Sequence, residues 1–302
     1  MAYDPDSPAP FGHMLTAMVT PFTPDGQVDF DGVARLAVHL VDAGNDGLII
    51  NGTTGESPTL TDAEKLASLR VVLDTVGDRA TIVVGAGNND TRHSIELARS
   101  AEAAGAHGLL IVTPYYNKPP QPGLAGHFLA IAEATGLPVM TYDIPGRTGT
   151  PIAADTFARL AEHPRIVANK DAKGDVAAAA GVIAQTGLAW YSGDDALTLP
   201  LHSVGAVGAV SVVGHVLAGR IAEMMAAHRA GDVAGATALN ASMIPAYVGM
   251  FRTQGVIMAK AALRELGLPG GPVRSPLVDA TAEQIATLRA DLAAAGVAGF
   301  TA

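Results

Sequence analysis

Among the five lysines of the chain, Lys170 occupies a position suited to covalent catalysis. It closes an apolar run over residues 166–169, a pattern that predicts a buried strand. A lysine amine in apolar surroundings has a lowered pKa, and the neutral amine can attack a carbonyl carbon to form an imine. A lysine at a strand end is more often a solvated surface group, so position alone leaves both interpretations open. The other lysines have other predicted positions: Lys65 on an exposed helix face, Lys118 and Lys173 in loops, and Lys260 in a helical tail.

Two tyrosines and an arginine follow neighbouring apolar runs. Tyr142 and Tyr116 are phenols suited to proton transfer, provided that a hydroxyl such as that of Thr53 orients them. Arg147 lies in a glycine-flanked loop, and its forked guanidinium is suited to binding a carboxylate. Taken singly, the tyrosines could be aromatic residues that pack loops, and the arginine could form a surface salt bridge.

Other kinds of chemistry find little support. The chain has no cysteine, which excludes disulfides, thiolate metal sites and cysteine nucleophiles. Its nine histidines lack ligand spacing, and no phosphate-binding loop, serine-nucleophile or zinc-protease motif occurs. Asp194 and Asp195 are adjacent, so their side chains would point to opposite sides of a strand. We interpret them as residues that organise a loop or line an entrance.

The polar clusters that hold these residues each follow an apolar run. The clusters cover residues 51–57, 113–120, 142–149, 170–173 and 192–195. Glycine, proline, asparagine and aspartate make turns in any protein, so one such cluster would carry little weight. Five clusters after five strands indicate a shared rim, where the loops at the carboxyl ends of parallel strands meet.

The elements that position this rim alternate between strand and helix. Strands are predicted over residues 15–19, 47–50, 81–84, 108–112, 138–142, 166–169, 189–192 and 206–211. Helical periodicity covers 31–43, 62–76 and 90–104, with a capping box from Thr61 to Glu64 and glycines where the helices should stop. Eight repeats of this kind favour a TIM (β/α)8 barrel. An open doubly wound sheet is the alternative, but it usually carries a glycine-rich turn after its first strand, and Thr20-Pro21-Phe22 does not resemble one.

The ends of the chain have a different character. Residues 1–12 are acidic and proline-rich, and we predict a short disordered tail before a catalytic barrel over 13–231. No strand pattern occurs over 232–302. This region is predicted to form a C-terminal appendage of three helices, with a loop over 269–276 before the last.

Composition limits the partners. A net charge of −10 argues against nucleic acid and anionic membranes, because both bind basic surfaces. Residues 196–219 hold no charged side chain and are long enough to cross a bilayer, but glycines, Pro200 and two histidines interrupt them. We interpret this stretch as buried barrel interior. Without a signal peptide pattern, the expected location is the cytoplasm.

The clusters, in this order, resemble the dihydrodipicolinate synthase (4-hydroxy-tetrahydrodipicolinate synthase) family, and are most similar to its actinobacterial members. The resemblance covers essentially the whole chain and includes GTTGES at 52–57, TPYYNKPP at 113–120, YDIPGRTG at 142–149, the lysine of KDA and SGDD at 192–195. GTTGE and the lysine are shared with other pyruvate-dependent class I aldolases. The double tyrosine and the arginine of YDIPGRTG favour the synthase.

The resemblance implies a lyase that forms a Schiff base. Lys170 would attack the ketone of pyruvate, and the resulting imine would tautomerise to an enamine. Tyr142, Thr53 and Tyr116 would form a proton relay, with Tyr116 reaching in from a neighbouring subunit. No metal or organic cofactor would be needed, because the lysine imine serves as the electron sink.

Substrate binding is implied for a second group of residues. Thr54 would hold the pyruvate carboxylate, and Arg147 would bind the carboxylate of L-aspartate 4-semialdehyde. Gly193 and Val210 would place backbone carbonyls near the imine, and Tyr115 would lie at a subunit interface. The product would be a hydroxy-tetrahydrodipicolinate that commits carbon to diaminopimelate and lysine biosynthesis, and the family is commonly a homotetramer built from dimers.

Two alternatives stay open at this point. One is a sister aldolase, such as N-acetylneuraminate lyase or a keto-deoxy sugar acid aldolase, with the same imine and another acceptor. The other is a barrel-shaped binding protein that has kept the fold and lost the chemistry, against which the intact set of lysine, tyrosine and threonine residues argues.

The resemblance also bears on inhibition by L-lysine. In members that respond to lysine, an acidic side chain at a subunit interface holds the ammonium group of the effector, with histidines nearby. In this sequence the acidic position falls on His93, and the histidine positions fall on Asp62 and Lys65. Tyr115, Ser57 and Asn89 of the same site are in place. We therefore expect weak or absent inhibition, unless the carboxylate of Asp62 takes over the lost role.

Overall fold

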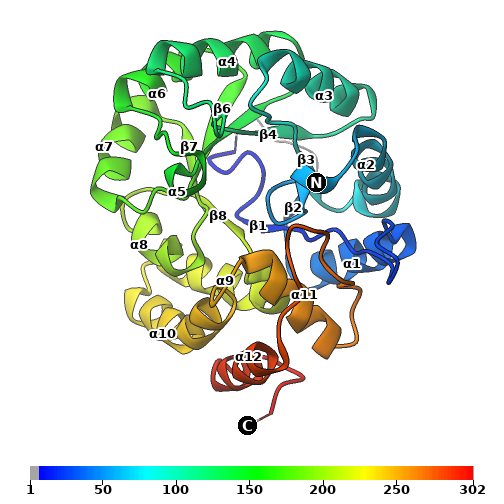
Figure 1. Cartoon of the computed structure of the whole chain (residues 1–302). Coiled ribbons are helices and arrows are strands. Elements are labelled where there is room, and N and C mark those ends of the chain that lie inside the picture. The colour runs from blue at the N-terminus through cyan, green and yellow to red at the C-terminus, as the bar shows by residue number, and fades with distance from the viewer. Residues whose placement is uncertain (1–6, 302) are drawn as a thin grey trace.

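Eight parallel strands close into a barrel at the centre of the computed structural model, which describes residues 7–301 (Figure 1). Each strand pairs with the next along the chain, and β1 pairs with β8 with Met14 opposite Ala209. Closure confirms the TIM barrel and excludes the open sheet. The strands are β1 (Met14–Ala17), β2 (Gly47–Ile50), β3 (Thr81–Gly85), β4 (Gly108–Val112), β5 (Val139–Asp143), β6 (Ile166–Asp171), β7 (Ala189–Ser192) and β8 (Gly208–Ser211).

A ring of helices surrounds the strands, and several begin at side chains that cap them. The hydroxyl of Thr61 accepts from the backbone N–H of Glu64, whose carboxylate accepts from the N–H of Thr61, so α2 (Asp62–Val76) starts with the predicted capping box. Asp90 caps α3 (Thr91–Ala103) in the predicted place. The other barrel helices are α1 (Phe30–Asp42), α4 (Gln121–Glu133), α5 (Pro145–Thr148), α6 (Ala154–Ala161), α7 (Val176–Thr186), α8 (Thr198–His202) and α9 (Gly214–Arg229), with short 3₁₀ turns η1 (Ser57–Thr59) and η2 (Asp195–Leu197).

The uncharged stretch over residues 196–219 is divided among three elements. It contributes α8, β8 and the first turns of α9. Within residues 7–301, no helix combines the length and the apolar character needed to cross a bilayer.

The N-terminal segment requires a correction. Phe11 falls in the predicted disordered tail but is fully buried, with its ring centroid 6.4 Å from that of Tyr191. Its backbone N–H donates to the Tyr191 hydroxyl at 3.2 Å. A single apolar side chain in a polar, proline-rich stretch has no periodicity, which is why the pattern misses it. Residues 9–12 are therefore packed, while residues 1–6 lie outside the described part of the chain.

Three helices follow the barrel and pack along one side of it, next to α9 (Figure 1). They are α10 (Val233–Gly249), α11 (Gly255–Glu265) and α12 (Ala282–Ala294), as expected for the helical appendage. The predicted division between residues 231 and 232 falls in the turn between α9 and α10. An irregular segment between α11 and α12 runs back toward the loop that follows β2.

Candidate active site

Lys170 and Tyr142 lie side by side at the carboxyl ends of adjacent strands. They are register partners on β6 and β5, and both side chains are buried. The Nζ of Lys170 lies 4.1 Å from the centre of the Tyr142 ring. Two groups placed on neighbouring strands at the mouth of a barrel have fixed separation, which suits them to act on one substrate atom.

The amine of Lys170 is set up to be partly neutral. Burial lowers the pKa of Lys170 to about 7, with the positive charge of Arg147 acting in the same direction and the carboxylate of Asp195 opposing it. A substantial fraction of the amine is then unprotonated at neutral pH, as attack on a carbonyl requires.

A second lysine is equally buried but differently paired. Lys260 of α11 is fully buried, and its Nζ lies 2.5 Å from Glu56 Oε1 and donates to the carbonyl of Pro272 at 2.7 Å. Burial lowers the pKa of Lys260 to about 8, against the effect of Glu56, which raises it. At neutral pH this amine is mainly protonated and committed to its partners, so it lacks the free lone pair that imine formation needs. The sequence pattern placed it in a helical tail without indicating its burial.

Tyr142 is poised to exchange protons with Thr53. Burial raises the pKa of Tyr142 to about 12, while Arg147 and the hydrogen bond with the Thr53 side chain act in the opposite direction. The phenol therefore stays protonated at neutral pH. It can donate a proton to a substrate oxygen, or take a proton from that oxygen by way of the Thr53 hydroxyl.

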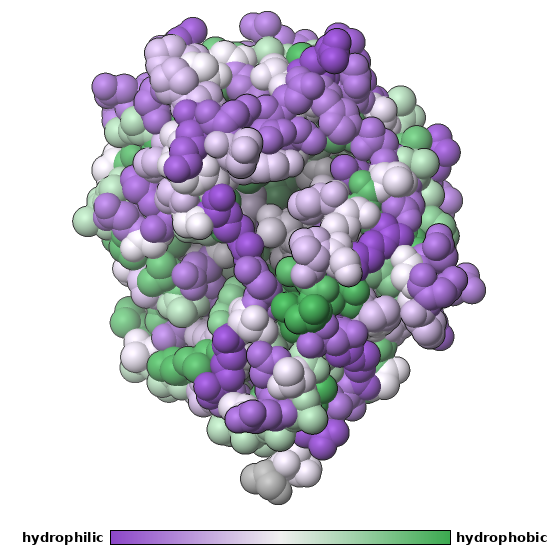
Figure 2. All heavy atoms as spheres, in the orientation of Figure 1, coloured by the Kyte–Doolittle hydropathy of each residue, from purple (hydrophilic) through white to green (hydrophobic). Residues whose placement is uncertain are grey.

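One cavity of about 260 Å³ brings most of the predicted site residues together. Figure 2 shows that this face of the molecule is hollowed near its centre. The ends of β5 and β6 and the loops after β2, β5, β7 and β8 form one part of the cavity wall, and the C-terminal helical region forms the rest. The predicted residues that line it are Lys170, Tyr142, Thr53, Thr54, Arg147 and Gly193.

Gly193 leaves room for the amine. A Cβ at this position would lie 2.9 Å from Cε of Lys170, closer than real Cβ contacts come, and a tight 3.0 Å from its Cγ. Val210 is fully buried among the side chains inside the barrel and is not part of the cavity wall. The roles of the Gly193 and Val210 carbonyls stay predictions.

Arg147 is held at the cavity by a residue that the sequence did not indicate. One of its Nη2 hydrogens is donated to Oε1 of Gln254 at 2.7 Å, and Gln254 is the N-cap residue of α11. Both side chains line the cavity that contains Lys170. A guanidinium anchored on one side keeps its other donors for a ligand carboxylate.

Comparisons with known proteins show the family of this chain. Residues 10–295 match the model of the "Dihydrodipicolinate synthetase family". The chain belongs to the dihydrodipicolinate synthetase family. Members of this family are enzymes, specifically lyases.

Relatives in the family are similar over nearly their whole length. The chain is 67% identical to the 4-hydroxy-tetrahydrodipicolinate synthase of Acidothermus cellulolyticus, covering 97% of this chain and 95% of the relative. It is 65% identical to 4-hydroxy-tetrahydrodipicolinate synthase 2 of Streptomyces coelicolor, covering 95% and 96%. The crystal structure of the dihydrodipicolinate synthase of Cyanidioschyzon merolae with lysine bound has a TM-score of 0.93 at 44% identity, covering 95% and 98%.

Tyr115 and Tyr116 have different surroundings in the single chain. Tyr115 lines a cavity of about 230 Å³ that also contains Thr53, Tyr142 and Arg147. Tyr116 does not line either cavity, is 90% exposed, and has a left-handed backbone with φ 73°. Its neighbours are fixed, because Asn117 Nδ2 donates to the Asn89 carbonyl and Asn89 Nδ2 donates to the Tyr115 carbonyl. In the single chain, Tyr116 is therefore a large aromatic side chain that is exposed on a held loop and has a left-handed backbone.

The two aspartates of SGDD take structural positions, as interpreted from the sequence. Asp195 is buried, and its carboxylate accepts from the Ser211 hydroxyl and from the backbone N–H groups of Val212 and Val213. Burial raises the pKa of Asp195 to about 6. Asp194 caps the 3₁₀ turn η2 through Ala196.

Of the three residues singled out for lysine sensitivity, His93 and Lys65 both contact Asp62. His93 Nε2 lies 2.9 Å from Asp62 Oδ2, and Lys65 Nζ lies 3.5 Å from Asp62 Oδ1. The side chain of Lys65 is only 11% exposed, so the prediction of an exposed helix face for it is wrong. The hydrogen bond with His93 lowers the pKa of Asp62 despite partial burial, and Lys65 adds to the effect. The carboxylate of Asp62 is therefore already shared between two basic groups.

No metal site is evident in the part of the chain that the structure describes. Over residues 7–301, no three histidine, aspartate or glutamate side chains are grouped as metal ligands would be.

Proposed function

We propose that this chain condenses pyruvate with L-aspartate 4-semialdehyde to form 4-hydroxy-tetrahydrodipicolinate. The observation that carries the proposal is a buried lysine with a pKa of about 7 beside a tyrosine, in a cavity that also holds an anchored arginine. The names of the 67% and 65% identical relatives support the same reaction.

The amine of Lys170 attacks the pyruvate ketone, and water leaves as the imine forms. Thr54, buried in the cavity wall, would hold the pyruvate carboxylate. Tyr142 and Thr53 transfer the protons that convert carbinolamine to imine and imine to enamine. The enamine carbon then forms a bond to the aldehyde carbon of the second substrate, whose carboxylate pairs with Arg147 and whose aldehyde oxygen takes up a proton from the relay. The amino group of the same substrate attacks the regenerated imine carbon, which closes the ring and releases the amine of Lys170.

A pair of assays separates this reaction from that of a sister aldolase. Pyruvate consumption is measured with L-aspartate 4-semialdehyde, and pyruvate release is measured with N-acetylneuraminate or a keto-deoxy sugar acid. We expect turnover only in the first assay. Turnover only in the second would reassign the enzyme, and no turnover in either would favour a binding protein.

We further propose that the enzyme acts in the cytoplasm as a homotetramer in which Tyr116 completes the proton relay of a neighbouring subunit. The 90% exposure and positive φ of Tyr116 support this role, because they leave its phenol displayed away from its own cavity.

Tyr116→Phe is expected to lower kcat roughly 10- to 100-fold, at or below the lower end of what one proton-transfer group contributes, because Tyr142 and Thr53 remain in place. Dilution of the unmodified enzyme until subunits separate should lower activity per chain in the same way. Activity and sedimentation are measured on the same dilution series, with Tyr115→Phe as a comparison. Full activity of a monomer would remove the intersubunit role.

L-Lysine is expected to inhibit weakly or not at all. A histidine in place of an acidic residue loses a charge-assisted contact with an ammonium ion, and Lys65 adds repulsion. Together these changes should weaken binding by roughly 2–4 kcal/mol, or about 30- to 1000-fold. The engagement of Asp62 with His93 and Lys65 makes a rescue by its carboxylate costly.

Initial rates across a lysine titration test this expectation, with His93→Glu as the variant that should gain sensitivity. Half-inhibition of the unmodified enzyme below about millimolar lysine, which corresponds to about 4 kcal/mol of binding, would contradict it.

A further inference from the structure

A buried ion pair joins the GTTGES loop to the C-terminal helical region. Glu56 has a left-handed backbone with φ 56°, and its side chain is buried. Its Oε1 lies 2.5 Å from the Nζ of Lys260 on α11, and its Oε2 accepts from the backbone N–H of Arg274 at 2.8 Å. Both carboxylate oxygens are therefore held by residues more than 200 positions away.

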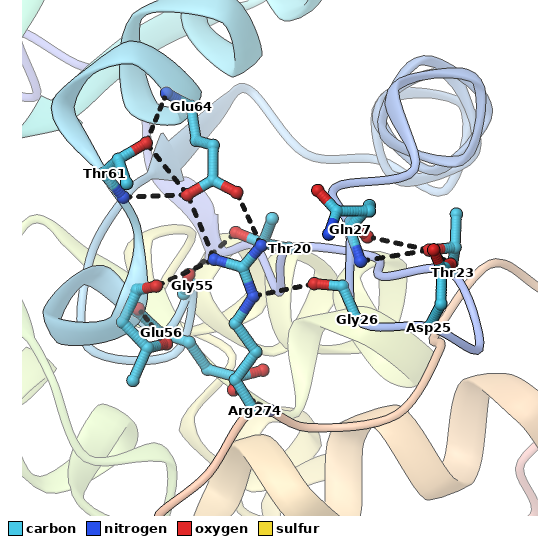
Figure 3. Close-up of polar contacts among 11 residues, drawn as sticks. Thr20, Thr23, Asp25, Gly26, Gln27, Gly55, Glu56, Thr61, Glu64 and Arg274 are labelled. Carbon is cyan, nitrogen blue, oxygen red and sulfur yellow. Dashed lines mark hydrogen bonds and ion pairs between the residues drawn. The ribbon is translucent and has the colours of Figure 1, made fainter.

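The guanidinium of Arg274 joins the end of the same loop to the first turn of α2 and to the loop between β1 and α1. It donates to the carbonyl of Thr59 at 2.7 Å and to both oxygens of Glu64 at 3.0 and 2.5 Å, and through Nε to the carbonyl of Gly26 at 2.9 Å. Figure 3 shows Arg274 between Glu64, at the start of α2, and Gly26. The pKa of Glu64 falls to about 2, chiefly because of the hydrogen bond with Arg274.

The packing beneath this cluster leaves little freedom. The ring of Phe22 lies 4.0 Å from the Nζ of Lys260 and 4.4 Å from the Cζ of Arg274, so both cations lie against one aromatic side chain. Gly271, with φ +64°, approaches the backbone of Phe22 so closely that a Cβ there would lie 2.1 Å from its carbonyl oxygen. The segment that carries Arg274 is thus seated directly on the barrel.

The held loop carries Thr53 and Thr54, which line the cavity with Lys170. The N–H of Glu56 donates to the carbonyl of Thr53 at 3.1 Å, so the position of Glu56 is transmitted to the residue that hydrogen-bonds Tyr142. Pro276 and Leu277, next to Arg274 in sequence, line the same cavity as Lys170 and Thr54.

Stability alone is a poor explanation for this arrangement. A buried ion pair often contributes little net stability, since desolvation offsets the attraction between the charges. What such a pair does provide is a defined geometry, and here that geometry fixes a loop in a left-handed turn next to the reacting amine.

We infer that Arg274, acting with Glu56 and Lys260, is a positioning residue that holds Thr53 and Thr54 in place for the proton relay. The C-terminal helical region thereby sets the geometry of the barrel's active site. This inference rests on the proposed function for its catalytic consequence, but the holding of the loop can be measured without it.

Arg274→Ala in the full chain is the test, with Arg289→Ala as the matched control. Arg289 pairs with Glu265 at the end of α11 and also joins parts of the helical region, but makes no contact with residues 52–60. Three quantities are measured for each variant: hydrogen exchange of the amides over residues 52–60, exchange of the pyruvate methyl protons with D₂O, and kcat and KM for pyruvate. All are measured well below the melting temperature.

Arg274→Ala is expected to speed amide exchange over 52–60 selectively and to lower kcat and methyl-proton exchange by roughly 10- to 100-fold, the effect of about an ångström of misplacement. Its KM for pyruvate should change less than its kcat, and Arg289→Ala should match the unmodified enzyme. Should Arg274→Ala not fold, Arg274→Lys, which keeps a cation beside Glu64 but loses the fork, is expected to show the same changes to a smaller degree.

The inference would be overturned if the folded Arg274→Ala variant had the same kcat and the same rate of methyl-proton exchange as the unmodified enzyme, whatever its melting temperature. Equal losses in Arg289→Ala would do the same. If the unmodified protein exchanges no pyruvate protons, the proposed function fails, and the amide exchange over 52–60 still decides whether Arg274 holds the loop.

Discussion

Lys170→Ala is expected to abolish covalent capture of pyruvate and to lower turnover by on the order of 10³-fold or more, as loss of a covalent nucleophile does. In the unmodified protein, borohydride reduction in the presence of pyruvate should add one pyruvyl unit, which peptide mapping places on Lys170. The reason is that, of the two buried lysines, Lys260 is paired with the carboxylate of Glu56, whereas Lys170 has no carboxylate bound to its amine.

The rate of capture should also depend on pH in a defined way. Since burial lowers the pKa of Lys170 to about 7, the neutral amine increases as pH rises through 7 and changes little above about 8. An unperturbed lysine would instead gain reactivity up to about pH 10. Initial capture rates from pH 5.5 to 9 distinguish the two profiles.

Lys173→Ala is the matched control, because this exposed lysine lies three positions after Lys170, just beyond the end of β6. The Lys173→Ala variant should be labelled on Lys170 at the same rate as the unmodified protein. A label found on Lys260, or no label at all, would remove the Schiff-base mechanism.

Arg147→Ala should have the second-largest effect, and most of that effect should fall on the second substrate. Loss of a charge-assisted clamp costs about 2–3 kcal/mol, which corresponds to roughly a 30- to 150-fold fall in kcat/KM for L-aspartate 4-semialdehyde. Capture of pyruvate by borohydride should persist. Its pH profile should move upward, because the positive charge of Arg147 helps to lower the pKa of Lys170.

Gln254→Ala provides the graded comparison for the arginine. It removes the 2.7 Å contact that anchors Arg147 but leaves the guanidinium itself, so kcat/KM for the semialdehyde should fall less than in Arg147→Ala. Kinetics with both substrates varied would show this order. Equal kcat/KM in the unmodified enzyme and Arg147→Ala would reassign the arginine to a structural role.

Much of the fold follows from local patterns. The helix over Asp62–Val76 begins at a capping box and has the bounds that periodicity predicted, because the signals lie within a few residues of one another. Strands over Gly47–Ile50, Gly108–Val112 and Ala189–Ser192 likewise have their predicted ends. Eight such repeats leave the barrel as the favoured closure, so topology followed from counting them.

The central pair of the site could also be anticipated. Lys170 and Tyr142 each end an apolar run, and parallel strands bring their carboxyl ends to one rim. The sequence thus predicted that Lys170 and Tyr142 lie together at this rim, through a rule that holds for every barrel of this kind.

Only the tertiary structure decided which buried groups are paired. The sequence predicted that Lys260 lies in a helical tail and Lys65 on an exposed helix face. In the structure Lys260 is fully buried against Glu56, and Lys65 lies against Asp62. The sequence also did not predict three other features: the burial of Phe11, the hydrogen bond between Arg147 and Gln254, and the contacts of Arg274 with the GTTGES loop. These contacts join residues 107 to 218 positions apart, with the exception of the local Asp62–Lys65 pair. Periodicity and capping act over a few residues, whereas such pairings depend on the path of the whole chain. The chemistry of each lysine is therefore set by the neighbour that this path brings next to it.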